Sequence, residues 1–134
     1  MVRLQHFKYL IRVIMQTQLQ MQQQVKAFLN EFKTKMSIYN VVFRDDRKKN
    51  TLSILSLDML PVERKEILKK LEITDYCEGP IKDALNGLPP MWVFGKHYKG
   101  KEIYIKISIG FENLAVICIS FHIAEFTISY PFKN

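Results

Sequence analysis

Polar and apolar side chains alternate along one stretch near the C-terminal end of the chain. In residues 102–109 (EIYIKISI) every odd position is isoleucine, and the even positions are Glu102, Tyr104, Lys106 and Ser108. Successive side chains of a strand point to opposite faces, so this alternation predicts a half-buried strand with its isoleucines in the core. Residues 110–113 (GFEN) then predict a turn, and residues 114–122 predict a second, more buried strand.

The same alternation predicts the two faces of the second strand. The residues expected to face the core are Ala115, Ile117, Ile119 and Phe121, and those expected on the opposite face are Cys118, Ser120 and His122. A short turn joins neighbouring antiparallel strands, so Tyr104 and His122 are expected to lie side by side. Both side chains should then be partly exposed and close to Lys106.

The N-terminal part of the chain predicts a helix. Residues 16–24 are rich in glutamine and lack Gly and Pro, and the helix is expected to continue to Lys33. Its apolar residues fall at i, i+3, i+4 and i+7, which is one core-facing stripe: Val25, Phe28, Leu29 and Phe32. Residues 1–15 are expected to add an amphipathic helix or an upstream extension.

The middle of the chain predicts shorter elements. β-Branched and aromatic residues predict a strand at 38–43, and residues 60–71 predict a helix with Pro61 in its first turn and acidic before basic residues. Residues 44–50 (RDDRKKN) form a charged break, either a solvated loop or a contact for an RNA backbone. Residues 51–57 are compatible with a strand or a helix.

Helices followed by antiparallel strands predict an α+β fold, with N-terminal helices packed on a C-terminal antiparallel sheet. The remaining expected elements are a loop at 74–80, a helical turn at 81–85, a strand at 91–96 with Trp92 and Phe94 on one side, a basic turn at 97–101, and a last strand at 126–130. A chain of 134 residues is large enough for one core. We therefore expect an N-terminal extension at 1–20, helical or flexible, and a single domain at 21–134.

The net positive charge of the chain indicates which classes of partner it can bind. Twenty Lys plus Arg against 13 Asp plus Glu give a net charge of +7, which favours RNA, DNA, an acidic membrane surface or an acidic protein. A merely soluble basic protein is the alternative. No apolar run reaches the ~18 residues that cross a membrane, and two cysteines without a disulfide framework suit a reducing cytoplasm. The spacing of histidines and cysteines predicts no metal site, and no cofactor motif is present.

The residues around the central hairpin suggest chemistry on a phosphate. Cleaving RNA without a metal needs a base, an acid and cations around the scissile phosphate. His122 suits proton transfer, and Tyr104 can donate a hydrogen bond or transfer a proton if a neighbouring lysine lowers its pKa. The candidate cations are Lys96, Lys99, Lys101 and Lys106, and the candidate planes for base stacking are Trp92, Phe94 and Tyr98. Taken singly, each has a structural alternative: a backbone-bonded histidine, a core tryptophan and solvated lysines.

At these residues the chain resembles a known family. Five segments between about Val25 and Lys133 carry the resemblance: VKAFLNEFK (25–33), TDYCEGP with Asp83 (74–83), MWVFGK (91–96), GKEIYIKI (100–107) and ICISFH-AE-YPF (117–132). They are similar to the MqsR family of bacterial toxin–antitoxin toxins, in its larger variant. The resemblance implies a RelE-like fold and a sequence-specific endoribonuclease that cleaves mRNA and is blocked by a cognate antitoxin.

The resemblance also implies roles for single residues. Tyr104 falls on a tyrosine that matters for activity in the short members of the family, and Lys106 falls on the lysine after it. Glu78 and Val93 stand where the short members have a lysine and a glutamine, and Glu78 is a candidate base in place of the lysine. His122 resembles the strand-end histidine of other RelE-like toxins.

Two functions of different classes follow. The first is metal-independent mRNA cleavage by 2′-OH attack, with Tyr104 and His122 handling protons, Lys96 and Lys106 on the phosphate, and Trp92 or Tyr98 against a base. The second is a non-catalytic RNA- or protein-binding module with the same fold. The first also predicts a small antitoxin that is acidic where it meets this basic protein.

Overall fold

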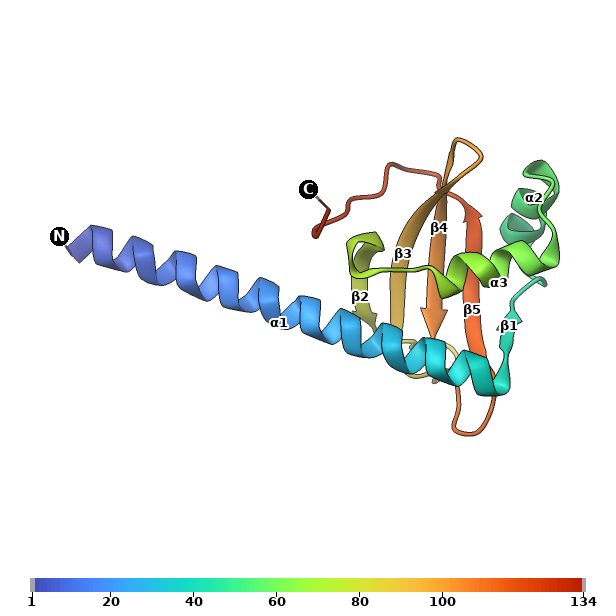
Figure 1. The fold of residues 1–134 in the computed structure, drawn as a ribbon, viewed down its shortest axis with the longest axis horizontal. Helices are drawn as coiled ribbons and strands as arrows, with labels where there is room; N and C mark the ends of the chain where they lie inside the picture. The colour runs from blue at the N-terminus through green and yellow to red at the C-terminus, as the bar shows by residue number, and fades with distance from the viewer. Residues whose placement is uncertain (1, 134) are drawn as a thin grey trace.

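The computed structural model describes residues 2–133, which form helices and one mixed five-stranded sheet (Figure 1). In chain order the elements are α1 (Val2–Tyr39), β1 (Val41–Phe43), α2 (Lys48–Ser56), α3 (Pro61–Lys69), a 3-10 helix (Ile73–Asp75), β2 (Tyr76–Ile81), β3 (Met91–Tyr98), β4 (Lys101–Ser108) and β5 (Val116–Ile123). The strand order is β1-β5-β4-β3-β2, with β1 parallel to β5 and the other pairs antiparallel. The predicted α+β class is confirmed, and the parallel edge strand β1 is a departure from the expected antiparallel sheet.

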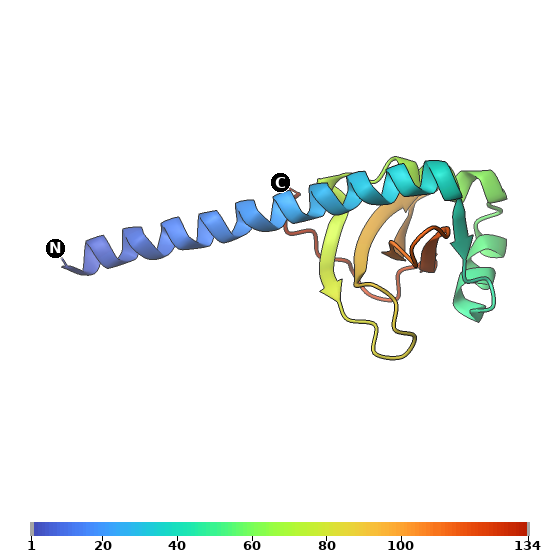
Figure 2. The same cartoon turned by 90° about the horizontal axis from the view of Figure 1, so that it is seen from below.

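Helix α1 covers one face of the sheet and is longer than predicted (Figure 2). Neither Gly nor Pro interrupts it, and it ends where Asn40 takes a left-handed conformation with a φ of 70°. Its expected stripe is buried, and Phe28 stacks on Trp92 with ring centroids 4.9 Å apart. The amphipathic pattern therefore identified the docked part of α1 correctly.

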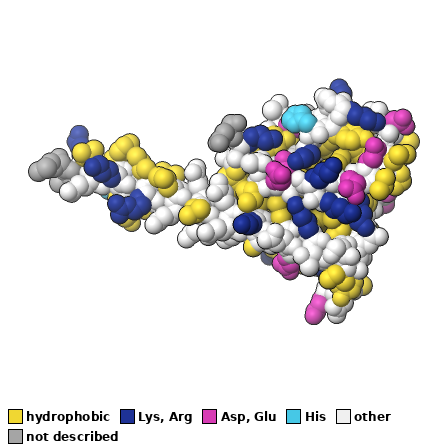
Figure 3. All heavy atoms as spheres, viewed as in Figure 1, with side chains coloured by type: hydrophobic (Ala, Val, Ile, Leu, Met, Phe, Trp, Pro, Cys, Tyr) yellow, Lys and Arg dark blue, Asp and Glu magenta, His cyan; other side chains and the backbone are white. Residues whose placement is uncertain are grey.

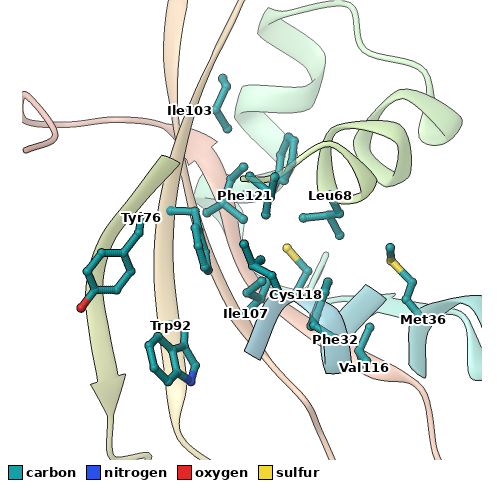
Figure 4. Close-up of a cluster of buried hydrophobic side chains, with 14 of the residues drawn as sticks. Phe32, Met36, Leu68, Tyr76, Trp92, Ile103, Ile107, Val116, Cys118 and Phe121 are labelled. Atoms are coloured by element: carbon teal, nitrogen blue, oxygen red, sulfur yellow. The ribbon is translucent and has the colours of Figure 1, made fainter. Parts of the chain in front are cut away.

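The core lies between the sheet and the helices α1 and α3 (Figure 4). Ile103, Ile105 and Ile107 of β4 are fully buried on this side, as their alternation predicted. Leu68 of α3 packs into the same cluster. Burial of one such side chain contributes roughly 1.5–3 kcal/mol, so this face of the sheet carries most of the hydrophobic stabilisation.

The first half of α1 extends away from the domain (Figures 1 and 3). Residues 3–20 are exposed, although this segment carries several large apolar side chains, among them Leu4, Phe7 and Ile14. At 1.5 Å per residue, these 18 residues extend for ~27 Å. None of the helices within residues 2–133 is both long and apolar enough to cross a membrane. The division into an extension at 1–20 and a domain at 21–134 stays a prediction.

Strand β5 contains one extra residue relative to β4. Lys106 pairs with Ser120. The next residue of β4, Ile107, pairs with Cys118, which leaves Ile119 as the additional residue of a β-bulge. Cys118 consequently faces the core, while Ser120 faces away from it. The prediction that Cys118 and Ser120 share a face is wrong, because the alternation of side chains is interrupted at the bulge.

The bulge also changes which residues of β5 enter the core. Val116 and Cys118 are fully buried before it, in place of the predicted Ala115 and Ile117. Beyond it the predicted pattern holds, and Phe121 is 1% exposed in the core cluster.

Asn50 of α2 fills the gap that the bulge opens. Its side-chain amide donates to the carbonyls of Ile119 and Arg44 at 3.1 and 3.0 Å, and its Oδ1 accepts from the Phe121 N–H at 3.0 Å. Asn50 is 2% exposed and its bonds to Ile119 and Phe121 are buried, so these two backbone groups have no access to water as an alternative partner. Helix α2 is thereby attached to the edge of β5.

Three other predicted segments differ in the structure. A loop is expected at 74–80, but residues 76–81 form the strand β2, and Pro80 is tolerated there because β2 is at the edge of the sheet. The helical turn expected at 81–85 is absent, and the charged break at 44–50 ends where α2 begins at Lys48. Residues 51–57, left open between strand and helix, lie mostly in α2.

The last strand expected at 126–130 is also absent, because the segment after β5 bonds to one side chain instead of to a strand. Glu102 accepts from the Ile128 N–H and from the Tyr130 hydroxyl, each at 2.9 Å. This C-terminal segment, residues 124–133, runs from the end of β5 across the face of the sheet opposite α1, and its end returns toward α1, where Phe132 stacks on Tyr76 (Figure 2). Gly95 permits the crossing, since a Cβ there would lie 2.2 Å from the Tyr130 hydroxyl oxygen.

The role of Asn50 predicts a large cost for its removal. Asn50→Ala should lower the free energy of unfolding by about 2–4 kcal/mol, because each buried polar group left without a partner costs about 1–3 kcal/mol. Urea unfolding measures this. Asn30→Ala, at an exposed position of α1, is the control and should change the free energy by no more than about 0.5 kcal/mol. An equal, small effect of both substitutions would contradict the assignment.

Candidate functional site

The face of the sheet opposite α1 carries two adjacent rows of polar residues. The strand register places Tyr104 directly across from His122, and Gly95 on the other side of Tyr104. In the next row Lys106 lies across from Ser120, with Glu78 further along on β2. The predicted meeting of Tyr104 and His122 on neighbouring antiparallel strands is confirmed.

These rows form the floor of a pocket of about 840 Å³. The start of α2 forms one wall, and the C-terminal segment forms another. Its lining residues are Arg47, Lys48, Lys49, Asn50, Cys77, Glu78, Tyr104, Lys106, Ser120, His122, Glu125, Phe126, Thr127, Ile128 and Ser129. Four of them are cations and two are carboxylates, so the pocket is positive before any charge on His122 is added. Such a pocket attracts a phosphate.

The Tyr104 and His122 rings stack on one another. Their centroids are 5.2 Å apart and the rings are inclined by 18°. His122 Nδ1 lies 2.9 Å from the carbonyl oxygen of Ile123, and a carbonyl can only accept, so Nδ1 carries a proton. In the neutral ring Nε2 is then the nitrogen that can take up a proton. Both side chains are partly exposed, as predicted.

The surroundings of Tyr104 and Lys106 shift their pKa values. Burial, and then the negative charge of Glu78, raises the pKa of the Tyr104 phenol above its usual value. The lowering of this pKa by a lysine, which sequence analysis raised as a condition, is not found, because burial and Glu78 outweigh the lowering charge of Arg47. Burial also lowers the pKa of Lys106, and Arg47 lowers it further by like-charge repulsion. Tyr104 is therefore a hydrogen-bond donor at neutral pH, and an anion beside Lys106 would relieve the repulsion.

Arg47 is the functional candidate that sequence analysis did not single out. It precedes α2, and its Nη1 donates to the Ile119 carbonyl at 3.3 Å and to Ser120 Oγ at 3.2 Å. These bonds hold the guanidinium at the bulge of β5, in the wall of the pocket. The sequence indicated Arg47 only as one of several charged residues at 44–50, a segment for which an RNA contact was one of two alternatives. The fold singles it out, because Arg47 bonds to Ser120 at the bulge.

Lys96 does not join the pocket. It pairs with Ile103 in the register, which puts it on the side of α1. There its Nζ lies 2.8 Å from Oδ2 of Asp75, whose side chain is 5% exposed. The placement of Lys96 on a phosphate with Lys106 is therefore corrected: in this structure it neutralises a buried carboxylate.

The predicted base-stacking residues also lie elsewhere. Trp92 is 8% exposed and packs between Phe28 and Tyr76 in the core, as its structural alternative proposed. Tyr98 and Lys101 face each other near the hairpin on the α1 side, and Lys99 Nζ donates to the Leu57 carbonyl at 3.0 Å. None of these four lines the pocket.

Glu78 does line the pocket, but far from His122. They are three strands apart, which at ~4.8 Å per strand is on the order of 14 Å between backbones. Glu78 thus acts on Tyr104 and Lys106 through its charge, and the proton acceptor next to Tyr104 is His122.

Neither the family models, nor the curated proteins, nor the solved structures include a match to this chain. The resemblance to the MqsR family and the RelE-like topology therefore stay predictions. Across residues 2–133, no three His, Cys, Asp or Glu side chains are grouped so that they could hold a metal ion.

The positions of Lys96 and Lys106 predict opposite effects on stability. Lys96→Met should lower the free energy of unfolding by about 1–3 kcal/mol, because it leaves the buried Asp75 carboxylate without its cation. Lys106→Met is the matched control and should leave stability unchanged or slightly raised, because burial already disfavours the charge of Lys106. Urea unfolding of both variants tests this. A larger loss for Lys106→Met would contradict the assignment.

Proposed function

We propose that this protein is an endoribonuclease of the mRNA-interferase type that cleaves RNA by 2′-OH attack without a metal. The observation that supports it best is the stacked Tyr104–His122 pair beside Lys106 and Arg47 in one positive pocket. A proton acceptor, a neutral donor and two cations are the groups that this reaction needs.

The roles follow from the chemistry of each group. His122 Nε2 takes the proton of the ribose 2′-OH, and the resulting oxygen attacks the phosphorus. Lys106 and Arg47 stabilise the negative charge that develops on the phosphate. The Tyr104 hydroxyl transfers its proton to the departing 5′-oxygen, which leaves as the 5′-OH, and water then returns a proton to the phenolate and removes the one held by His122. The products are a 2′,3′-cyclic phosphate and a 5′-OH.

The proposal also names the cellular compartment in which the protein acts and the protein that regulates it. Its substrate is cytoplasmic mRNA, and its regulator is an antitoxin protein with an acidic surface, since opposite charge speeds association with a protein of charge +7. The alternative function is a non-catalytic RNA- or protein-binding module. The raised pKa of Tyr104 favours that alternative, because it makes the phenol a weaker acid toward the departing 5′-oxygen.

Substitution of the stacked pair tests the proposal. Purified protein is incubated with a long mRNA and EDTA, and the ends of the products are mapped. His122→Gln and Tyr104→Phe should each lower the cleavage rate by about 10²- to 10⁴-fold, which is typical for a lost proton-transfer group, with little change in melting temperature. Expression of the wild type should arrest growth, and expression of these variants should not.

His97→Gln is the control, because His97 is exposed and outside the pocket lining. It should cleave like the wild type. RNA binding without cleavage by the wild type would support the binding module, and cleavage by His122→Gln at the wild-type rate would remove His122 from the mechanism.

A further inference from the structure

One aromatic side chain at the pocket has no role in the fold. Phe126 lines the pocket from the C-terminal segment, and its side chain is 85% exposed. Burying a phenylalanine contributes roughly 1.5–3 kcal/mol, and the fold gains almost none of this from Phe126. Since the exposed ring belongs to the lining of a positive pocket, it is in position to contact a molecule bound there.

The backbone around Phe126 is held on both sides by a single residue. Glu102 of β4 accepts from the Ala124 N–H through its main-chain carbonyl at 2.8 Å, and from the Ile128 N–H through its carboxylate at 2.9 Å. Glu125, next to Phe126, forms an ion pair with Lys49 of α2. Ala124 and Ile128, two positions before and after Phe126, are thus both bonded to Glu102. The backbone that carries the Phe126 ring is therefore fixed before a ligand binds.

The other rings that line the pocket, and two rings that are buried in the core, cannot take this place. Trp92 and Tyr76 are buried in the core, and Tyr104 and His122 stack on one another within the pocket. Phe126 is therefore the aromatic lining residue whose faces are open to a bound molecule. A planar group held there would lie beside the cations that attract a phosphate.

We propose that Phe126 is the stacking platform for a nucleobase next to the phosphate bound in the pocket. This proposal rests on the proposed function, and it assigns the base contact to Phe126 in place of Trp92 and Tyr98. Stacking on an aromatic ring is open to every base, so Phe126 supplies affinity and position rather than sequence choice.

The experiment measures binding in place of cleavage. The RNA is a single-stranded oligonucleotide that carries a 2′-deoxy sugar at the mapped cleavage site, so that it binds without reacting. A second RNA lacks one base beside that site, on the 5′ side in one version and on the 3′ side in another. Each is titrated against wild type, Phe126→Ala and Phe126→Trp.

Phe126→Ala should weaken binding of the intact RNA by about 5- to 150-fold. Removing the stacked base should weaken binding by the wild type to a similar extent, but should add little to the loss in Phe126→Ala. Phe126→Trp should bind at least as tightly as the wild type. A structural role for Phe126 would not produce this dependence on a single base, and all variants should keep the wild-type melting temperature.

Phe111→Ala is the control, because Phe111 is also exposed but lies in the turn between β4 and β5, at the far end of the strands (Figure 1). It should bind both RNAs like the wild type. If the wild type binds RNA and Phe126→Ala binds equally well, or the base deletion affects both alike, the stacking proposal is wrong while the proposed function stands. If the wild type binds no RNA, both are wrong.

Discussion

The three hydrogen bonds of Asn50 hold the bulge of β5 in place, and the arrangement of both faces of the sheet depends on that bulge. Without the bulge, with Ile119 paired as a regular strand residue, Cys118 and Ser120 would share a face, and the residues on one side of Ile119 would point to the opposite face of the sheet. With it, Cys118 enters the core while Ser120 and His122 remain on the pocket side. A buried amide in α2 thus determines the direction of side chains on which the candidate chemistry depends.

Stability and the candidate chemistry are separated by the sheet. The helices α1 and α3 bury the isoleucines of β4 on one side, so Tyr104 and Lys106 between them point to the opposite face. On the other side Glu102 and Gly95 hold the C-terminal segment close to the strands. The pocket is open between that segment and α2, which explains why its lining comes from parts of the chain far apart in sequence.

Alternation within a strand was sufficient to predict the Tyr104–His122 pair, because β4 alternates regularly and His122 follows the bulge of β5, on the same face as Ser120. It failed for Cys118, since a bulge depends on a tertiary partner, Asn50, that no local pattern reveals. Lys96 and Trp92 were misplaced for another reason. Their strand was predicted correctly, but both side chains lie on the face that α1 covers, where Lys96 pairs with Asp75 and Trp92 packs on Phe28. Arg47 lies outside any strand, and only the fold brings it to the pocket.

The exposed half of α1 gives the molecule a rigid handle. Its first turns are separated from the sheet by ~27 Å of continuous helix, and the pocket opens on the side of the sheet that α1 does not cover. A fluorophore, an affinity tag or a solid support joined at this end is therefore held at a distance from Tyr104 and His122. The protein can be immobilised there in one orientation while the pocket stays open to a long polymer.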